Sequence, residues 1–195
     1  MKCFQSLFFL ILLLVACNQN NKNKSISPKI IPANYVEINT VGLEKIQDVV
    51  FFNGKKWDGY IYEMYNQKDT AFVKSYLNGI EEGTHKSWYP NKQLAEKRFY
   101  HNGKKEGTHY AWWENGIQQT EYQVSNDEYT GVFKEWNRNG LLVKIFHYKN
   151  GQEEGSQKLF YDNGSIRSNY IIIKGRRFGL LGTKNCKNVK DSLSH

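Results

Sequence analysis

Histidine and glutamate are the side chains of this chain whose type and spacing could support chemistry. His85 and His109 stand 24 positions apart, and converging imidazoles could bind a metal ion. Five glutamates that could act as acids or bases recur at equivalent places: Glu81, Glu82, Glu106, Glu153 and Glu154. Their regular period argues against convergence, because equivalent side chains two strands apart lie roughly 10 Å from each other, too far to share one ion. The sequence also lacks G-x-S-x-G, H-E-x-x-H and P-loop motifs. We therefore expect no catalytic residues, no metal site, no cofactor and no small-molecule substrate.

A cysteine near the N-terminus stands in a setting that favours covalent modification. Lys2 precedes the apolar run FQSLFFLILLLVA (4–16), which has the length of a secretory signal and is shorter than the ~20 residues of a membrane-spanning helix. The run ends in Leu14-Val15-Ala16-Cys17, which resembles the lipobox of bacterial lipoproteins. The resemblance implies cleavage before Cys17 and acylation of that residue, which would anchor the chain to a membrane. An ordinary secretory signal or an uncleaved anchor is the alternative.

Composition divides the chain into four expected segments. These are a signal peptide (1–16), Cys17 with a flexible linker (17–42), a repeat domain (43–182) and a polar tail (183–195). The linker begins NQNNKNKSISPKIIPAN, which is too polar to bury a core and predicts a tether. Residue 18 is Asn rather than Asp, which does not suggest retention at the inner membrane. The linker also lacks an acidic run of the kind that would suggest export to the cell surface. We expect an outer-membrane location facing the periplasm. Cys186 is the one cysteine left after Cys17, so no disulfide framework is expected.

The repeat domain has a period of 24 residues, marked by six glycines: Gly59, Gly83, Gly107, Gly131, Gly155 and Gly179. Bulky side chains follow five positions after the first five glycines: Met64, Trp88, Trp112, Trp136 and Phe160. A second column stands one position further on: Tyr65, Tyr89, Trp113, Asn137 and Tyr161. Two turn signals interrupt each repeat, and most are Asn-Gly, which favours the type I′ turn of a β-hairpin. The runs between turns are short and rich in aromatic and β-branched residues, so each repeat predicts strand, turn, strand, turn.

These patterns predict an all-β fold, an elongated single-layer antiparallel β-sheet built from stacked hairpins of about 24 residues. About 12 strands at ~4.8 Å spacing would extend over roughly 50–60 Å. We expect LEKIQDVVFF (43–52) to form one lone strand that opens the array, and residues 175–182 to form half a repeat that ends it.

The repeat resembles a known family. NGKKEGTHYAWWENGIQQTEYQ (102–123) is the clearest copy, and it resembles the MORN-type repeat, more closely the bacterial MORN-2 variant found in tandem in lipoproteins. The resemblance implies β-hairpins that stack into a twisted sheet. The family is sometimes labelled antitoxin, which implies binding and neutralisation of an incoming toxin.

Two aromatic columns are candidates for function. We predict that Trp88, Trp112 and Trp136 form a structural ladder, in which large rings cover one another between strands. The second column, with Tyr65, Tyr89, Trp113 and Tyr161, is the candidate binding face; a purely structural role for it stays open.

Charge adds a second possibility. The chain has 27 Lys and Arg against 19 Asp and Glu, a net charge of +8. A solvated surface accounts for this excess, and so would attraction to anionic lipid head groups. We expect a protein-interaction scaffold with an unidentified partner in the cell envelope. The alternative is binding of phospholipid head groups or another anionic envelope component, and no nucleic acid is expected.

Overall fold

The structure is a computed structural model that describes residues 29–182. The predicted signal peptide (1–16), Cys17, the first part of the linker and the tail (183–195) with Cys186 lie outside the described residues. No helix able to cross a membrane occurs among residues 29–182.

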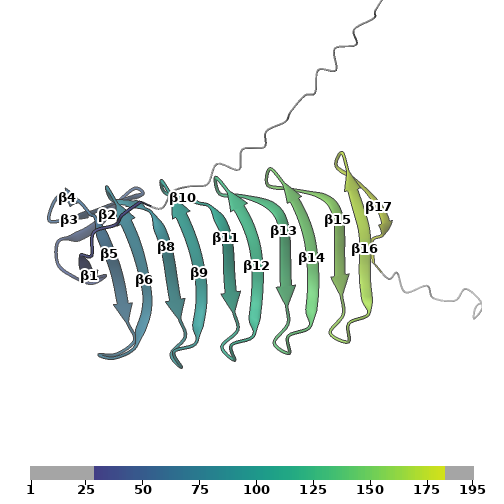
Figure 1. Ribbon diagram of the computed structural model, residues 1–195, viewed down its shortest axis with the longest axis horizontal. Coiled ribbons are helices and arrows are strands. Elements are labelled where there is room, and N and C mark those ends of the chain that lie inside the picture. Colours follow the sequence, from purple (N-terminus) through teal and green to yellow (C-terminus); the bar gives the residue numbers. More distant parts are fainter. Residues whose placement is uncertain (1–28, 183–195) are drawn as a thin grey trace, which may run out of the picture.

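The strands form one long sheet in which successive hairpins stand side by side (Figure 1). The five hairpins are β5 (Gly59–Met64) with β6 (Thr70–Leu77), β8 (Gly83–Trp88) with β9 (Leu94–His101), β11 (Gly107–Trp112) with β12 (Gln118–Ser125), β13 (Glu128–Trp136) with β14 (Leu142–Lys149), and β15 (Gln152–Phe160) with β16 (Ile166–Ile173). The short strands β7 (Ile80–Glu81) and β10 (Lys104–Lys105) lengthen β8 and β11 towards the preceding turn. β17 (Arg176–Leu180) is the last half repeat. The predicted all-β sheet of stacked hairpins is confirmed.

Two kinds of turn join the strands. Between hairpins, both turn residues have positive φ, as in Asn102 (53°) and Gly103 (78°), which confirms the predicted type I′ geometry. Within four of the five hairpins the same prediction is wrong, because only the last turn residue has positive φ, such as Gly116 at 85°. There Gly116 N–H donates to the Trp113 carbonyl at 2.8 Å, and Asn115 Oδ1 accepts from the Ile117 amide at 3.2 Å. The asparagine side chain therefore caps a type I turn, and its own backbone stays right-handed.

Two departures from regular strand geometry recur with the period of the repeat. The six repeat glycines have φ between 65° and 146°, where other residues would be strained. Each hairpin also has a register shift just before its bulky fifth-position residue, for example between Ser87 and Trp88. A β-bulge breaks the alternation of side chains between faces, so a simple period-two reading fails beyond this point.

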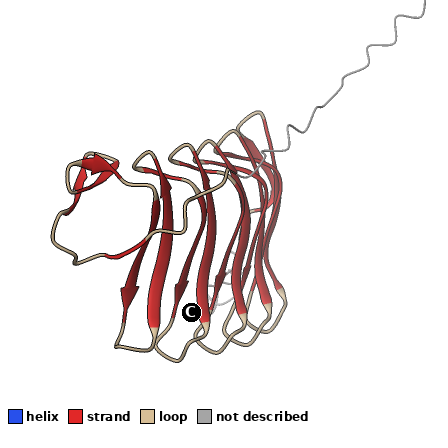
Figure 2. Cartoon of the chain, turned by 60° about the vertical axis from the view of Figure 1, so that its left-hand side comes forward, coloured by secondary structure: helices blue, strands red, loops and turns tan. Residues whose placement is uncertain are grey.

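The N-terminal end of the array differs most from the prediction. Residues 43–52 form a hairpin, β2 (Leu43–Ile46) and β3 (Val49–Phe52), because Gln47 turns the chain with φ 55°. With β4 (Lys55–Lys56) they make a separate three-stranded sheet, seen at one end in Figure 2. The predicted lone strand is wrong, because its apolar residues pack as a cap on the end of the array.

The predicted linker also contains structure. β1 (Tyr35–Glu37) runs parallel to β5, so the sheet is not wholly antiparallel. Val36 is buried with Val50, Ile61 and Tyr76 in a small core. Within the predicted linker, this segment is thus fixed to the array, because it covers the edge of the first hairpin and buries apolar surface.

Candidate binding surfaces of the repeat sheet

Strand register divides the sheet into two faces. Directly opposed residues of neighbouring strands share a face. His85 is opposite Arg98, and Gly83 is opposite Tyr100; we name their side the histidine face. Lys86 is opposite Lys97, and we name that side the lysine face.

A ladder of rings runs along the histidine face. Consecutive ring centroids are 4.3–6.5 Å apart through Tyr76, His85, Tyr100, His109, Tyr122, Phe133, Tyr148, Phe146 and Tyr170. Tyr100 lies between the two histidines, so these imidazoles are rungs of the ladder rather than a converging pair. Stacking of such rings stabilises neighbouring strands.

Both histidines are held neutral inside this ladder. Burial lowers the pKa of His85 to about 4, and its Nε2 donates to the Ser75 carbonyl at 3.0 Å. His109 is fully buried, burial lowers its pKa, and its Nε2 lies 3.0 Å from the Phe99 carbonyl. These imidazoles tie adjacent strands together. Within residues 29–182, no three His, Cys, Asp or Glu side chains are grouped so that they could hold a metal ion.

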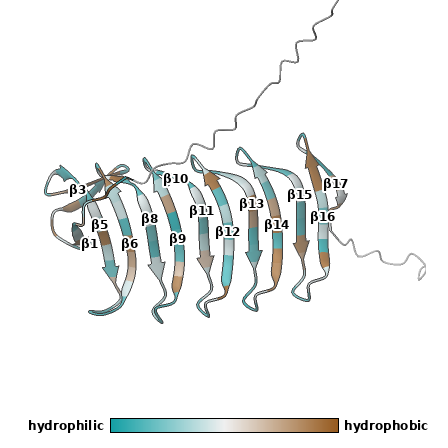
Figure 3. Ribbon diagram, in the orientation of Figure 1, coloured by the Kyte–Doolittle hydropathy of each residue, from teal (hydrophilic) through white to brown (hydrophobic). Residues whose placement is uncertain are grey.

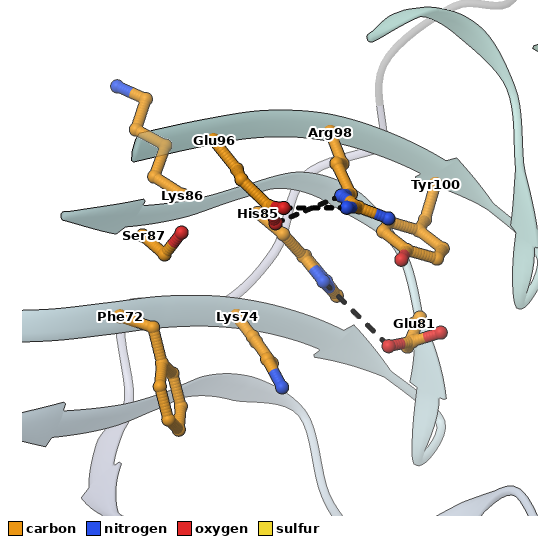
Figure 4. Close-up of a pocket in the computed structure, with 9 residues that line it drawn as sticks. All are labelled: Phe72, Lys74, Glu81, His85, Lys86, Ser87, Glu96, Arg98 and Tyr100. Carbon is orange, nitrogen blue, oxygen red and sulfur yellow. Dashed lines mark hydrogen bonds and ion pairs between the residues drawn. The ribbon is translucent and has the colours of Figure 1, made fainter. Parts of the chain in front are cut away.

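A hollow of about 280 Å³ opens beside this part of the ladder (Figure 4). Its lining carries both charge signs. Arg98 contacts Glu96 through two hydrogen bonds of 2.7 and 3.1 Å, and Glu81 Oε1 lies 3.8 Å from His85 Nδ1. Burial raises the pKa of Glu81. Lys74 lies 4.6 Å above the Phe72 ring and, among the described residues, has no carboxylate within ion-pair distance. Several cations, two carboxylates and aromatic surface are therefore presented together.

The predicted binding column links successive repeats through its polar atoms. The Tyr65 hydroxyl donates to the Trp88 carbonyl at 2.8 Å, and the Tyr89 hydroxyl donates to the Trp112 carbonyl at 3.0 Å. Trp113 Nε1 donates to the Trp136 carbonyl, also at 3.0 Å. The half-buried tryptophans of the fifth-position column thus receive a bond from the preceding repeat.

The rings of the same column border two further hollows. Tyr65 and Tyr89 line one of about 410 Å³ together with Trp88, and this hollow shares Phe72, Ser87 and Glu96 with the first. Another, of about 420 Å³, is lined by Trp113 and Tyr161 with Trp136. The structure therefore brings the four predicted residues together in two places, and the polar side-chain atoms of Tyr65, Tyr89 and Trp113 also bond the next repeat.

One buried cluster was missed by sequence reasoning. Glu82 is 3% exposed and accepts from Lys29 Nζ, the Asn102 amide and His101 Nδ1, each at 2.9 Å. Burial opposes its ionisation, but these hydrogen bonds outweigh burial and lower the pKa of Glu82. The equivalent Glu106 accepts from the Asn126 amide at 2.9 Å. The two glutamates cap turns, and Lys29 lies too far away in sequence for spacing to reveal it.

The lysine face carries an unusual row of charges. Opposed residues continue across the strands through Lys86, Lys97, Tyr110, Glu121, Lys134, Ile145 and Lys158. Lys86 and Lys97 are both exposed and directly opposite, an arrangement that destabilises a sheet. Glu121 is the one acid in the row and lies 3.9 Å from Lys134 Nζ. This face can attract anions.

Comparison with known proteins agrees with the repeat geometry. A family described as a MORN repeat variant matches residues 81–104 and 153–170. These stretches span β7 to the start of β10, and most of β15 and β16. No curated protein matches the chain. The two matches and the register of the hairpins lead to one conclusion: the chain carries MORN-type repeats.

Proposed function

We propose that this chain is a lipid-anchored envelope protein whose repeat sheet binds a protein partner through the histidine face. MORN repeats are generally associated with binding of proteins or membrane phospholipids. The proposed role is binding without catalysis.

The observation that carries the proposal is the pair of adjoining hollows on β6, β8 and β9. They place the Lys74 ammonium, the Arg98–Glu96 pair and the rings of Tyr89 and Tyr100 along one path. Tyrosine, tryptophan and arginine dominate the energetics of protein interfaces, because they combine large apolar area with directed hydrogen bonds. An extended segment with charges of both signs fits this lining, whereas the shallow form would leave a small molecule largely exposed.

The cellular location in this proposal rests on the N-terminal sequence. Cys17 would carry the acyl chains and hold the sheet at the outer membrane, facing the periplasm. A finer version is an immunity role, in which the partner is an incoming toxin that the sheet neutralises.

The test is capture from an envelope extract with the full chain as bait, at low and high salt. Ser87 lines both hollows, so Ser87→Arg should fill the path and abolish capture of a discrete partner. Thr84→Arg is the matched control, because Thr84 is exposed on the same strand and faces the other side. Equal capture by both variants, with unchanged unfolding midpoints, would refute the proposed face.

A second candidate function is binding of anionic lipid head groups, favoured by the row of charges on the lysine face. The four lysines of this row attract anions, and salt weakens the attraction by screening it. Vesicles with and without phosphatidylglycerol provide the test, because the N-terminal anchor binds both alike. Lys86→Glu with Lys97→Glu should remove the preference for anionic vesicles, while Ser87→Arg should retain it. A preference that survives the double substitution would exclude this candidate.

A further inference from the structure

Among residues 29–182, no strand covers the C-terminal edge of the sheet. β17 has one neighbour, β16, whereas the equivalent strands β5, β8, β11, β13 and β15 each have a strand on both sides. All five residues of β17 are exposed. The second strand of this last repeat is therefore missing from residues 29–182, and the sheet ends halfway through a hairpin.

The opposite end of the sheet offers only a short edge, because the last strand there is β1, with three residues. β1 covers the outer edge of β5, and the three-stranded sheet packs there through Val36, Val50 and Ile61. A five-residue β17 of a second molecule would find only the three residues of β1 to pair with at that end. The short β1 edge disfavours head-to-tail growth and favours association of two β17 edges.

Backbone geometry leaves β17 ready for this association. The two-residue turn Lys174-Gly175 makes Ile173 and Arg176 a hydrogen-bonded pair, and such pairs alternate along antiparallel strands. The amide groups of Arg176, Phe178 and Leu180 thus face β16. Those of Arg177 and Gly179 face outward, where they can bond a further strand.

The side chains of β17 are self-complementary. When two copies run antiparallel with Phe178 on the two-fold axis, Arg176 lies opposite Leu180 and Arg177 lies opposite Gly179. No arginine then opposes an arginine. The outward amides of Arg177 and Gly179 meet in hydrogen-bonded pairs, as an antiparallel ladder requires.

An apolar patch would be covered by the same pairing. Phe178 and Leu180 are 51% and 45% exposed, and they share a face with Ile171 and Ile173, which are 42% and 49% exposed. Figure 3 shows the end of β16 that adjoins β17 as hydrophobic. Across the two-fold axis, Ile171 and Phe178 would continue into Phe178 and Ile171 of the second copy. This row removes apolar surface from water on both copies.

We propose that two copies of this chain associate through β17, edge to edge and antiparallel, to form a closed dimer with one continuous sheet. The proposal does not depend on the partner of the histidine face.

Self-cross-linking tests the register. In a full chain with Cys3, Cys17 and Cys186 changed to serine, Phe178→Cys places two sulfurs across the axis, with Cα atoms ~4.5 Å apart. Ile171→Cys is the control, because its copies would lie about 14 Å apart, beyond the reach of a disulfide. We expect a covalent dimer from Phe178→Cys alone. Absence of that dimer, or equal cross-linking of both variants, would overturn the register.

Mass measurement tests the dimer itself. Light scattering of the protein, with bound detergent subtracted, should give twice the mass of one chain over a concentration series; one chain is 22.9 kDa before removal of the predicted signal peptide. Phe178→Lys should give the monomer, because two ammonium groups would meet at the axis. Leu141→Lys, at an equally exposed residue in the turn between β13 and β14, should remain a dimer. A wild-type monomer at all concentrations, or a dimer that survives Phe178→Lys, would overturn the proposal.

Discussion

The buried imidazole of His85 makes the stability of the sheet depend on pH. His85 is 5% exposed, and burial is the largest cause of its lowered pKa, followed in the same direction by Lys74 and Arg98. The hydrogen bond to the Ser75 carbonyl favours the charged form but does not outweigh burial. In the unfolded chain the imidazole regains its ordinary pKa of 6.5. Between pH 6.5 and about 4 the unfolded chain therefore binds a proton that the folded chain does not.

The sign and size follow from this difference. The contribution of His85 to the free energy of unfolding is fully present above pH 6.5 and is lost as the pH falls towards 4. A gap of about 2.5 pH units, at about 1.4 kcal/mol for each, gives about 3 kcal/mol from His85. His109 contributes in the same direction, because burial lowers its pKa too.

Substitution of His85 by glutamine isolates this effect. Gln157 occupies the equivalent place in a later repeat, is fully buried, and bonds both the amide and the carbonyl of His147, at 3.1 and 2.9 Å. His85→Gln should therefore fold and keep a donor for the Ser75 carbonyl. Urea unfolding of the full chain, followed by tryptophan fluorescence above pH 6.5 and at pH 4, gives the loss of stability. The loss should be about 3 kcal/mol smaller in His85→Gln. An equal loss in the wild type and the variant would refute the reasoning.

Substitutions elsewhere test two further sets of contacts and the predicted acylation. Glu82→Ala should lower the free energy of unfolding by about 3 kcal/mol, because Lys29 and the Asn102 amide lose a buried carboxylate. Glu106→Ala should lower it by about 1 kcal/mol. Urea unfolding compares the two variants, and equal losses would contradict the role of the Glu82 cluster. Tyr89→Phe should lower the free energy of unfolding by about 1 kcal/mol, since the Trp112 carbonyl loses its donor; an unchanged unfolding midpoint would contradict the link. Cys17→Ser should abolish labelling of the chain by radioactive palmitate in cells, and labelling as strong as that of the wild type would contradict acylation at Cys17.

Sequence alone predicted those features of the fold that depend on local chemistry. The spacing of Gly59 and its five equivalents gave the repeat period, and Asn102-Gly103 forms the expected turn. Even Lys174-Gly175, which lacks asparagine, adopts this turn, because the period places it there. Conformational demands of single residues and their period were enough to give the hairpin repeat.

The features that sequence missed depend on contacts between distant segments. Residues 43–52 contain no Gly, Pro or Asn, and Gln47-Asp48 is not a strong turn pair, so no local signal predicts the turn between β2 and β3. The bulge before Trp88 leaves the 24-residue spacing unchanged, so the sequence pattern does not reveal it, yet it changes which side chains share a face. Lys29 and Glu82 meet only because the N-terminal segment crosses the array.

Cross-linking in living cells tests the central claim, that the histidine face holds a protein partner, most directly. A photoreactive amino acid at Ser87 lies between the two adjoining hollows, and the same group at Thr84 lies on the opposite face of the same strand. The account predicts that illumination joins a discrete protein to the Ser87 position and not to Thr84. Protein adducts from Thr84 alone, or lipid adducts alone at either position, would contradict it.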